Sequence, residues 1–337
     1  MRGGGITVFV DAALEYALRC YNFQGCNIEN INSGSNRVYR IQKGGLNFYL
    51  RISSREYSYI AAEIDWMMFL GDEVHVPVLL GSNSGELIET YQDGGKSCVI
   101  CVFHELPGTF WDKNNPSLWN ETVFFNWGKA MGKMHRATKN YRPPVGKPGR
   151  LLFEDNLVPL EPYRNIPSVC EKLFAMHGDI AKLPHDADSY GLIHSDMHQQ
   201  NFFINDDHIG ILDFEDCQYG FFALDIGIAL YHAIWWGLPE EDSKKNDFAL
   251  KIIENFMSGY RAENRLSELW LKKIRMFMLY RQIDALRWHL GYYRPKRMDE
   301  VVYNDLFGIH YDFGKNIHFI ENDIFYENCQ IGDNSFV

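Results

Sequence analysis

The first third of the chain shows the alternation of apolar and polar residues that is typical of β-strands. The runs NRVYRI (36–41) and LNFYLRI (46–52) alternate in this way, and QKGG between them indicates a hairpin turn. Three further strands are predicted at Val76–Leu80, ELIETY (86–91) and SCVICVF (97–103). The pattern therefore predicts a region rich in strands up to about residue 105.

One helix is predicted among these strands, roughly from Glu56 to Leu70. Glu63 lies on the apolar face of this helix, where a carboxylate needs a partner. In the run 46–52, Arg51 points away from the apolar side chains that alternate with it. We therefore predict an ion pair between Arg51 and Glu63. The alternative is a solvated Glu63 and a surface Arg51 on a sheet edge.

The pattern changes at HELPG (104–108), where a Pro-Gly pair ends the strand region. Helical periodicity follows over the segments 121–138, 168–183, 223–237, 248–263 and 266–293. The segment 142–167 holds half of the 12 prolines and is expected to be an irregular surface crossing. The tail after Arg297 has an ambiguous pattern.

These patterns predict an α+β protein with two lobes. A small β-rich N-terminal lobe would comprise residues 1–105, and a large helical C-terminal lobe residues 106–337. Clefts between two such bodies are favoured places for ligands.

The segment LIHSDMHQQNFFINDDHIGILDFED (192–216) places polar residues at the edges of two short apolar runs. The turn DDHIG reverses the chain between the runs, which should return Asp213 to the neighbourhood of Asn201. A carboxylate and an amide oxygen close together suit Mg²⁺ that is shared with substrate phosphates. Asp196 could then accept the proton of an attacking hydroxyl, which completes the set that phosphoryl transfer needs.

The alternative interpretation of this segment is a hairpin with acidic ends. However, Asp196, Asn201 and Asp213 all match the kinase template HRDxxxxN followed by a magnesium-binding Asp. The loop NSGSN (32–36) precedes the first predicted hairpin and could present backbone N–H groups to phosphates, although a plain turn fits it equally well.

Composition narrows the class of protein. With 46% hydrophobic and 23% charged residues, the chain is globular. No apolar run reaches the length of about 18 residues that a membrane span needs. The N-terminus matches a signal peptide poorly, so we predict a cytoplasmic protein without a membrane partner. The seven cysteines are scattered, and we expect reduced thiols.

The net charge of −11 argues against a nucleic-acid partner. It is compatible with a cationic small-molecule substrate, although ordinary solubility explains it as well.

Aromatic residues, among them Trp235 and Trp236, are concentrated in the helical region. Their faces could attract an ammonium group, and the alternative is that they form helix-packing core.

With these motifs, the chain resembles the aminoglycoside phosphotransferase and choline kinase superfamily, the protein-kinase-like kinases of small molecules. The resemblance extends from about Asn32 to about Arg287. Its specific part is IHSDMHQQNFFI, GILDFED and ALDIG, which are similar to the family patterns H-G-D-x-H-x-x-N, I-D-[WF]-[ED] and Y/F-D-[IL]. Ser195 replaces the usual Gly, and Gln199-Gln200 replace the common Pro-Gly.

The resemblance implies a protein-kinase-like fold that uses ATP and Mg²⁺. It implies that Asp196 is the catalytic base and that His194 supports the catalytic loop. Asn201 and Asp213 would bind Mg²⁺. Asp225 would be an internal hydrogen-bond acceptor that holds the loop.

The resemblance also implies a nucleotide site in the first lobe. Arg51, where many kinases have Lys, would bind phosphates with Glu63 as its helix partner. The remaining residues implied to contact the nucleotide are Gly34, Ser35 and Asn36 of the loop and the hinge residues Phe103, His104, Glu105 and Leu106. Glu215 matches a choline kinase pattern and could contact a second metal or a cationic substrate.

The leading hypothesis is an ATP-dependent phosphotransferase that acts on a hydroxyl of a small molecule, such as an amino alcohol or an aminoglycoside-like compound. The alternatives are a bacterial protein Ser/Thr kinase of the same superfamily and a catalytically silent nucleotide-binding homologue. The sequence leaves the acceptor open.

Overall fold

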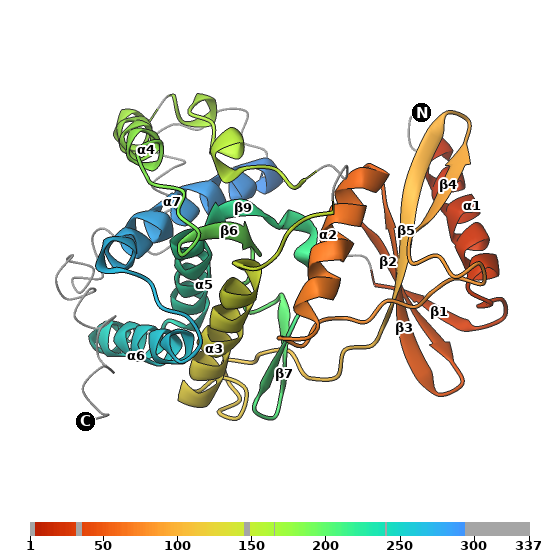
Figure 1. Cartoon of the computed structure of the whole chain (residues 1–337), viewed down its shortest axis with the longest axis horizontal. Coiled ribbons are helices and arrows are strands. Elements are labelled where there is room, and N and C mark those ends of the chain that lie inside the picture. Colours follow the sequence, from red (N-terminus) through yellow and green to blue (C-terminus); the bar gives the residue numbers. More distant parts are fainter. Residues whose placement is uncertain (1–3, 32–35, 145–148, 165, 240, 294–337) are drawn as a thin grey trace. The chain divides into compact units, whose positions relative to one another are not determined.

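The computed structural model of the chain describes residues 4–31, 36–144, 149–164, 166–239 and 241–293 (Figure 1). The backbone forms two compact units. Unit 1 comprises Met1–Gly108, Arg142–Arg150 and Gly210–Glu215, and unit 2 comprises Thr109–Tyr141, Leu151–Ile209 and Asp216–Val337. The first change of unit falls at Gly108, inside the predicted joint. Unit 1 also includes two later segments of the chain, which a single domain boundary in the sequence cannot predict.

Unit 1 is built on a five-stranded antiparallel sheet in the order β1-β2-β3-β5-β4. Its strands are β1 (Asn27–Asn30), β2 (Arg37–Lys43), β3 (Leu46–Ser53), β4 (Glu89–Asp93) and β5 (Lys96–His104). The predicted hairpin is confirmed, because β2 and β3 are joined at Gly44 and Gly45, which both have positive φ.

The predicted strand at Val76–Leu80 is wrong. This segment forms only an isolated bridge between Leu79 and Phe103. Pro77 explains the difference, because proline has no N–H to give to a continuous strand ladder. The strand predicted over 86–91 is shorter at its start, since β4 begins at Glu89.

Two helices cover the two sides of this sheet (Figure 1): α1 (Gly4–Cys20) and α2 (Tyr57–Leu70). Ala13 and Ala17 of α1 belong to the same buried core as Phe48 and Leu50 of β3. The helix predicted around 56–70 is confirmed as α2. Helix α1 was not predicted, because its sequence carries no strong helix start signal.

Unit 2 is mainly helical and contains α3 (Glu121–Thr138), α4 (Pro167–Ile180), α5 (Phe222–Gly237), α6 (Asp242–Arg261) and α7 (Glu268–Tyr293). Helices α3 and α6 pack side by side (Figure 1). A Cβ added to Gly128 of α3 would lie 1.9 Å from the carbonyl oxygen of Phe256. This glycine therefore permits the close approach of the two helix backbones.

Four short strands lie within and next to the predicted catalytic segment. β6 (Tyr190–Ile193) pairs with β9 (Gln218–Phe221) in an antiparallel sheet, and β7 (Phe202–Asn205) pairs with β8 (His208–Ile211). The second apolar run of this segment, Ile209–Phe214, is only partly a strand. β8 ends at Ile211, and Phe214–Asp216 form the 3-10 helix η3. The surface crossing contains two more 3-10 helices, η1 (Phe153–Asn156) and η2 (Glu161–Tyr163).

No helix in the described part of the chain is both long enough and apolar enough to cross a bilayer. The cysteines within the same residues are free thiols, as expected, and Cys98 and Cys101 are buried in β5. The architecture is α+β, with one β-rich and one helical unit, as the sequence pattern predicts.

Candidate active site

The loop that follows β6 is fixed by the first turn of α5. Asp225 accepts hydrogen bonds from the backbone N–H groups of His194, at 3.0 Å, and Ser195, at 2.8 Å. Ser195 has a φ of 67°, a left-handed conformation that is unfavourable for a residue with a side chain. The predicted role of Asp225 as an internal acceptor that holds the loop is confirmed.

Asp225 is itself held by a buried histidine of α3. Nε2 of His135 lies 3.1 Å from Oδ2 of Asp225, and Nδ1 of His135 lies 2.9 Å from the hydroxyl of Tyr260. Burial lowers the pKa of His135, although Asp225 opposes that shift. A neutral His135 can donate to Asp225 through one nitrogen and accept from Tyr260 through the other. The hydrogen bonds that join Asp225, His135 and Tyr260 can therefore all form while His135 stays uncharged.

Within the loop, the carboxylate of Asp196 is held by its own neighbours. Its Oδ2 accepts a hydrogen bond from Nδ2 of Asn201 at 3.1 Å and lies 3.3 Å from Nε2 of His198. Nδ2 of Asn201 also donates to the backbone oxygen of Asp196 at 2.9 Å. His194 is fully buried, and its Nδ1 accepts from the backbone N–H of Asp196 at 3.3 Å. These contacts join the predicted base, the predicted metal ligand and the predicted loop support.

The other oxygen of Asp196 accepts a hydrogen bond from Arg281 of α7. Burial alone would raise the pKa of Asp196, but Arg281 and His198 outweigh it and hold that pKa well below its usual range. Asp196 is therefore ionised at neutral pH. An ionised carboxylate with an accessible lone pair can accept a hydrogen bond from a substrate hydroxyl.

Sequence reasoning missed Arg281, His198 and His232. Nε of Arg281 donates to Nε2 of His232 at 3.0 Å, and its Nη1 lies 3.1 Å from Asp284. His198 matches the second His of the family pattern, but no function was predicted for it. Arg281 lies 85 positions from Asp196, so no local spacing could reveal the contact. The one local signal was the Arg281–Asp284 pair at helical spacing.

The two aromatic residues predicted to bind substrate, Trp235 and Trp236, lie at the end of α5, and Trp111 of the loop before α3 lies beside them. The ring of Trp236 lies 5.1 Å from that of Trp235 and 6.0 Å from that of Trp111. Trp236 is 39% exposed, whereas Tyr231 and Trp270 are buried in the core. Trp235 and Trp236 thus belong to a partly exposed aromatic surface, and their contact with substrate stays a prediction.

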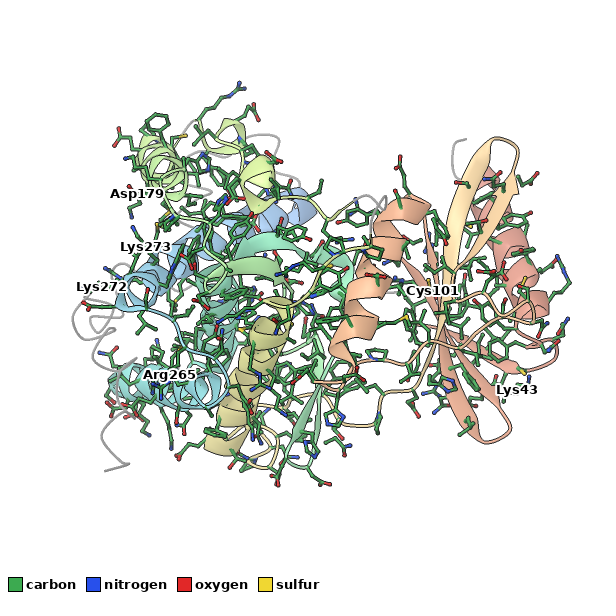
Figure 2. The ribbon with its side chains drawn as sticks, viewed as in Figure 1. Lys43, Cys101, Asp179, Arg265, Lys272 and Lys273 are labelled. Carbon is green, nitrogen blue, oxygen red and sulfur yellow. The ribbon has the colours of Figure 1, made fainter. Side chains whose placement is uncertain are left out.

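The predicted ion pair of unit 1 is confirmed. Nη1 of Arg51 lies 2.8 Å from Oε1 of Glu63, and both side chains are buried. Burial alone would lower the pKa of Arg51, but Glu63 and other groups, including Asp213, raise it above its usual value. Arg51 pairs in register with Cys101, which Figure 2 labels on β5. The buried Nη2 of Arg51 has no hydrogen-bond partner among the described residues.

The predicted phosphate loop is only partly described. Gly34 and Ser35 lie outside the described residues. Asn36 is buried, and its Nδ2 donates to the carboxylate of Glu215. Nε of Arg55 lies 3.4 Å from the same carboxylate. The position of Asn36 at the end of the loop is thus set by Glu215.

Glu215 is also held through its backbone. Its carbonyl oxygen accepts hydrogen bonds from the hydroxyl of Tyr59, at 3.3 Å, and from the guanidinium of Arg150. Arg150 lies over the ring of Tyr59, 3.7 Å from its centroid. These contacts favour a structural role for Glu215. Its predicted contact with a substrate or second metal stays a prediction.

Two oxygen ligands were predicted for Mg²⁺. Asp213, in unit 1, has a φ of 55°, a left-handed conformation that Asp tolerates better than most residues. Asn201, in unit 2, uses its amide nitrogen on Asp196, which leaves its amide oxygen as the atom for a cation. The described residues contain no cluster of three or more His, Cys, Asp or Glu suited to a metal. Carboxylate and amide oxygens are ligands that Mg²⁺ prefers, and the assignment of these two residues to the ion stays a prediction.

The predicted hinge follows β5. The backbone N–H of His104 donates to Val78 at 2.8 Å, and that of Glu105 donates to Asn47 at 3.2 Å. These two donors are therefore engaged within unit 1. The side chain of Leu106 packs against Gly210, and the contact of the hinge with a nucleotide base stays a prediction.

This fold and this loop define a class of protein, the phosphoryl-transferring enzymes with a protein-kinase-like fold. A sequence profile of the Phosphotransferase enzyme family matches residues 27–258. The chain belongs to this family, which is the family that its motifs predict.

Individual proteins are also similar to this chain over most of its length. The chain is 30% identical over 283 residues to amicoumacin kinase of Bacillus subtilis (strain 168), which covers 81% of this chain and 82% of the relative. A solved structure of amicoumacin kinase hAmiN in complex with AMP-PNP, Ca²⁺ and Ami is 26% identical, with a TM-score of 0.78, over 89% of this chain and 91% of that one.

A microcompartment-associated aminopropanol kinase shares the fold. It is 19% identical, with a TM-score of 0.67, over 81% of this chain and 86% of that one. The protein is thus a kinase of small molecules with a protein-kinase-like fold.

Proposed function

We propose that the protein transfers the γ-phosphoryl group of ATP to a hydroxyl of a small molecule, with Asp196 as the base. The observation that carries this proposal is the geometry of the loop 194–201. Asp225 fixes the loop from below, and Asn201, His198 and Arg281 fix the ionised carboxylate of Asp196. A carboxylate held in this way can orient a hydroxyl for attack on a phosphoryl group.

Unit 1 would bind the nucleotide. The buried Nη2 of Arg51 is a charged donor with no partner among the described residues, which suits an α- or β-phosphate oxygen of ATP. Glu63 orients Arg51 from the other side. The N–H of Leu106 is the proposed donor to the base, and Asn36 lies at the end of the proposed phosphate loop.

We propose Asn201 and Asp213 as the ligands of Mg²⁺. Their oxygen chemistry and their spacing in the sequence support this assignment. A bound magnesium ion would neutralise negative charge on the phosphates. Ca²⁺ accompanies AMP-PNP in the solved relative.

The acceptor would be an amino alcohol or a larger amino-containing compound with a hydroxyl group. Two solved relatives, named for amicoumacin and aminopropanol, support this class. The partly exposed rings of Trp111, Trp235 and Trp236 could contact an apolar or cationic part of such a compound. A contact of Glu215 with the acceptor receives less support, because Asn36 and Arg55 engage its carboxylate.

The experiment is a screen for acceptor-dependent release of ADP. Purified protein with ATP and Mg²⁺ is given amicoumacin, aminopropanol, choline, ethanolamine, aminoglycosides and a basic peptide, and the phosphorylated product is identified by mass spectrometry. We expect one amino-containing small molecule to stimulate ADP release and to gain one phosphoryl group. Phosphorylation of the peptide alone would support the protein-kinase alternative. A thermal shift with ATP and no turnover with any acceptor would support the silent homologue.

A further inference from the structure

The guanidinium of Arg281 joins three side chains around the predicted base. It donates to Oδ1 of Asp196, to Nε2 of His232 at 3.0 Å and to Oδ2 of Asp284 at 3.1 Å. The side chain of Arg281 is only 15% exposed. Such a three-way contact fixes the plane of a guanidinium, because its N–H donors have a rigid fork geometry.

The arginine begins a row of alternating charges on one face of α7. Arg281, Asp284 and Arg287 are three residues apart, and Nη2 of Arg287 lies 2.8 Å from Oδ1 of Asp284. Together with Asp196, the row holds two acidic and two basic groups, so their formal charges cancel. Asp216 adds a further negative charge close enough to raise the pKa of Arg281.

A buried ion pair of this kind is a weak source of stability, because removing charges from water offsets most of their attraction. Orientation is a stronger reason for such a contact. Asn201 and His198 hold one oxygen of Asp196, and Arg281 holds the other. A carboxylate that is bound at both oxygens cannot rotate about its last bond, yet it keeps lone pairs for one more donor.

We propose that Arg281 is the positioning residue of this kinase, which holds the carboxylate of Asp196 in the orientation that receives the acceptor hydroxyl. This inference rests on the proposed function, in which Asp196 is the base. Arg281 acts through Asp196 and does not bind the nucleotide. His232 and Asp284 in turn fix Arg281, so that α5 and α7 both contribute to the orientation of the base.

The test compares Arg281→Met, Arg281→Lys and the matched control Arg287→Met. Arg287 lies on the same face of α7 and contacts Asp284, but its side chain is 41% exposed. For Arg281→Met we expect kcat to fall between about tenfold and 100-fold, the size of effect that a slightly misplaced catalytic group produces. The KM for ATP should stay within about twofold, because no proposed nucleotide contact is lost.

Lysine keeps the charge but loses the fork, so Arg281→Lys should recover only part of kcat. Arg287→Met should stay within about threefold of wild type, because exposed ion pairs contribute little. Arg281→Met should also release a larger fraction of its ADP without phosphorylated acceptor, since water needs less orientation than the acceptor does. A merely structural role would not change that fraction.

A wild-type kcat in Arg281→Met, or an equal loss in Arg287→Met, overturns the proposal. Asp196→Asn, assayed in parallel, separates the two claims. If Asp196→Asn is inactive and Arg281→Met is normal, only the inference on Arg281 fails. If Asp196→Asn is fully active, the proposed function fails.

A crystal structure of Arg281→Met, or of Arg281→Lys if the first variant does not fold, gives a readout without turnover. We expect the Asp196 carboxylate to rotate away from Asn201 and His198. An unchanged orientation overturns the proposal.

Discussion

The carboxylate of Asp225 accepts a hydrogen bond from the backbone N–H of Ser195 at 2.8 Å, where the backbone has a φ of 67°. The same carboxylate accepts from His194, so one buried side chain holds two consecutive peptide groups of the catalytic loop. The family pattern has Gly where this chain has Ser195. The contact with Asp225 offsets the cost of placing a residue with a side chain in the left-handed region.

Asp225→Asn should weaken both the loop and the fold. The substitution replaces one carboxylate oxygen, which accepts hydrogen bonds, by an NH2 group, which only donates them. One buried backbone N–H of the loop is then left without an acceptor. We expect a loss of about 2 kcal/mol in the free energy of unfolding and a fall of kcat of about tenfold or more. Urea denaturation and steady-state kinetics measure the two effects. Asp188→Asn, at a carboxylate that is 89% exposed, is the control and should change neither value.

Glu63→Gln should destabilise unit 1 and weaken ATP binding. The substitution leaves the buried charge of Arg51 uncompensated, and we expect a loss of roughly 3 kcal/mol. The KM for ATP should rise more than the KM for the acceptor. Arg40→Met is the control, because the Arg40–Glu29 pair on the same sheet is exposed and should contribute less than about 1 kcal/mol. Equal effects of the two variants would contradict the assignment of Arg51 to the nucleotide.

The pH dependence of stability should report on His135. Burial lowers the pKa of His135 and of His177 below the usual value of a histidine. The folded state therefore binds fewer protons than the unfolded state once the pH falls below about 6.5, and stability that is present above that pH is lost. We expect the urea midpoint to decrease between about pH 7.5 and about pH 5.5. His135→Asn should make this decrease smaller, because the variant lacks the buried imidazole that must take up a proton.

The contact between α3 and α6 should not tolerate a larger residue at Gly128. A Cβ there would lie 1.9 Å from the carbonyl oxygen of Phe256, so Gly128→Ala must push two helix backbones apart. We expect a loss of more than about 2 kcal/mol, as for other overpacked sites. Gly178→Ala on α4 is the matched control. Its Cβ would meet nothing within 4 Å, so it should be neutral or stabilising by up to about 1 kcal/mol.

The sequence predicted those parts of the site that depend on local spacing. Asp196 and Asn201 are five residues apart, so the short loop that joins them was enough to predict that they lie close together. The pairing of Arg51 with Glu63 followed from the periodicity of the strand and that of the helix. Asp225 was placed by the resemblance to the family. In each case the interacting residues lie on a loop, strand or helix that the sequence pattern or motif identifies directly.

Other features could not be predicted because they depend on distant packing. The contact between Arg281 and Asp196 requires the register of α7 against the catalytic loop, which no periodicity encodes. The segment Val76–Leu80 has strand-forming residues, but Pro77 interrupts its ladder. The later segments of unit 1, 142–150 and 210–215, join it through contacts such as that of Arg150 with Tyr59.

Asp196→Asn tests whether Asp196 is the base of this small-molecule kinase. The measurement is the rate of acceptor phosphorylation by wild type and variant, with ATP binding followed by thermal shift as a check on folding. We expect the variant to bind ATP as wild type does and its kcat to fall by about 100-fold or more. A variant that folds, binds ATP and phosphorylates the acceptor within about threefold of the wild-type rate would show that Asp196 is not the base, because a general base contributes far more than that.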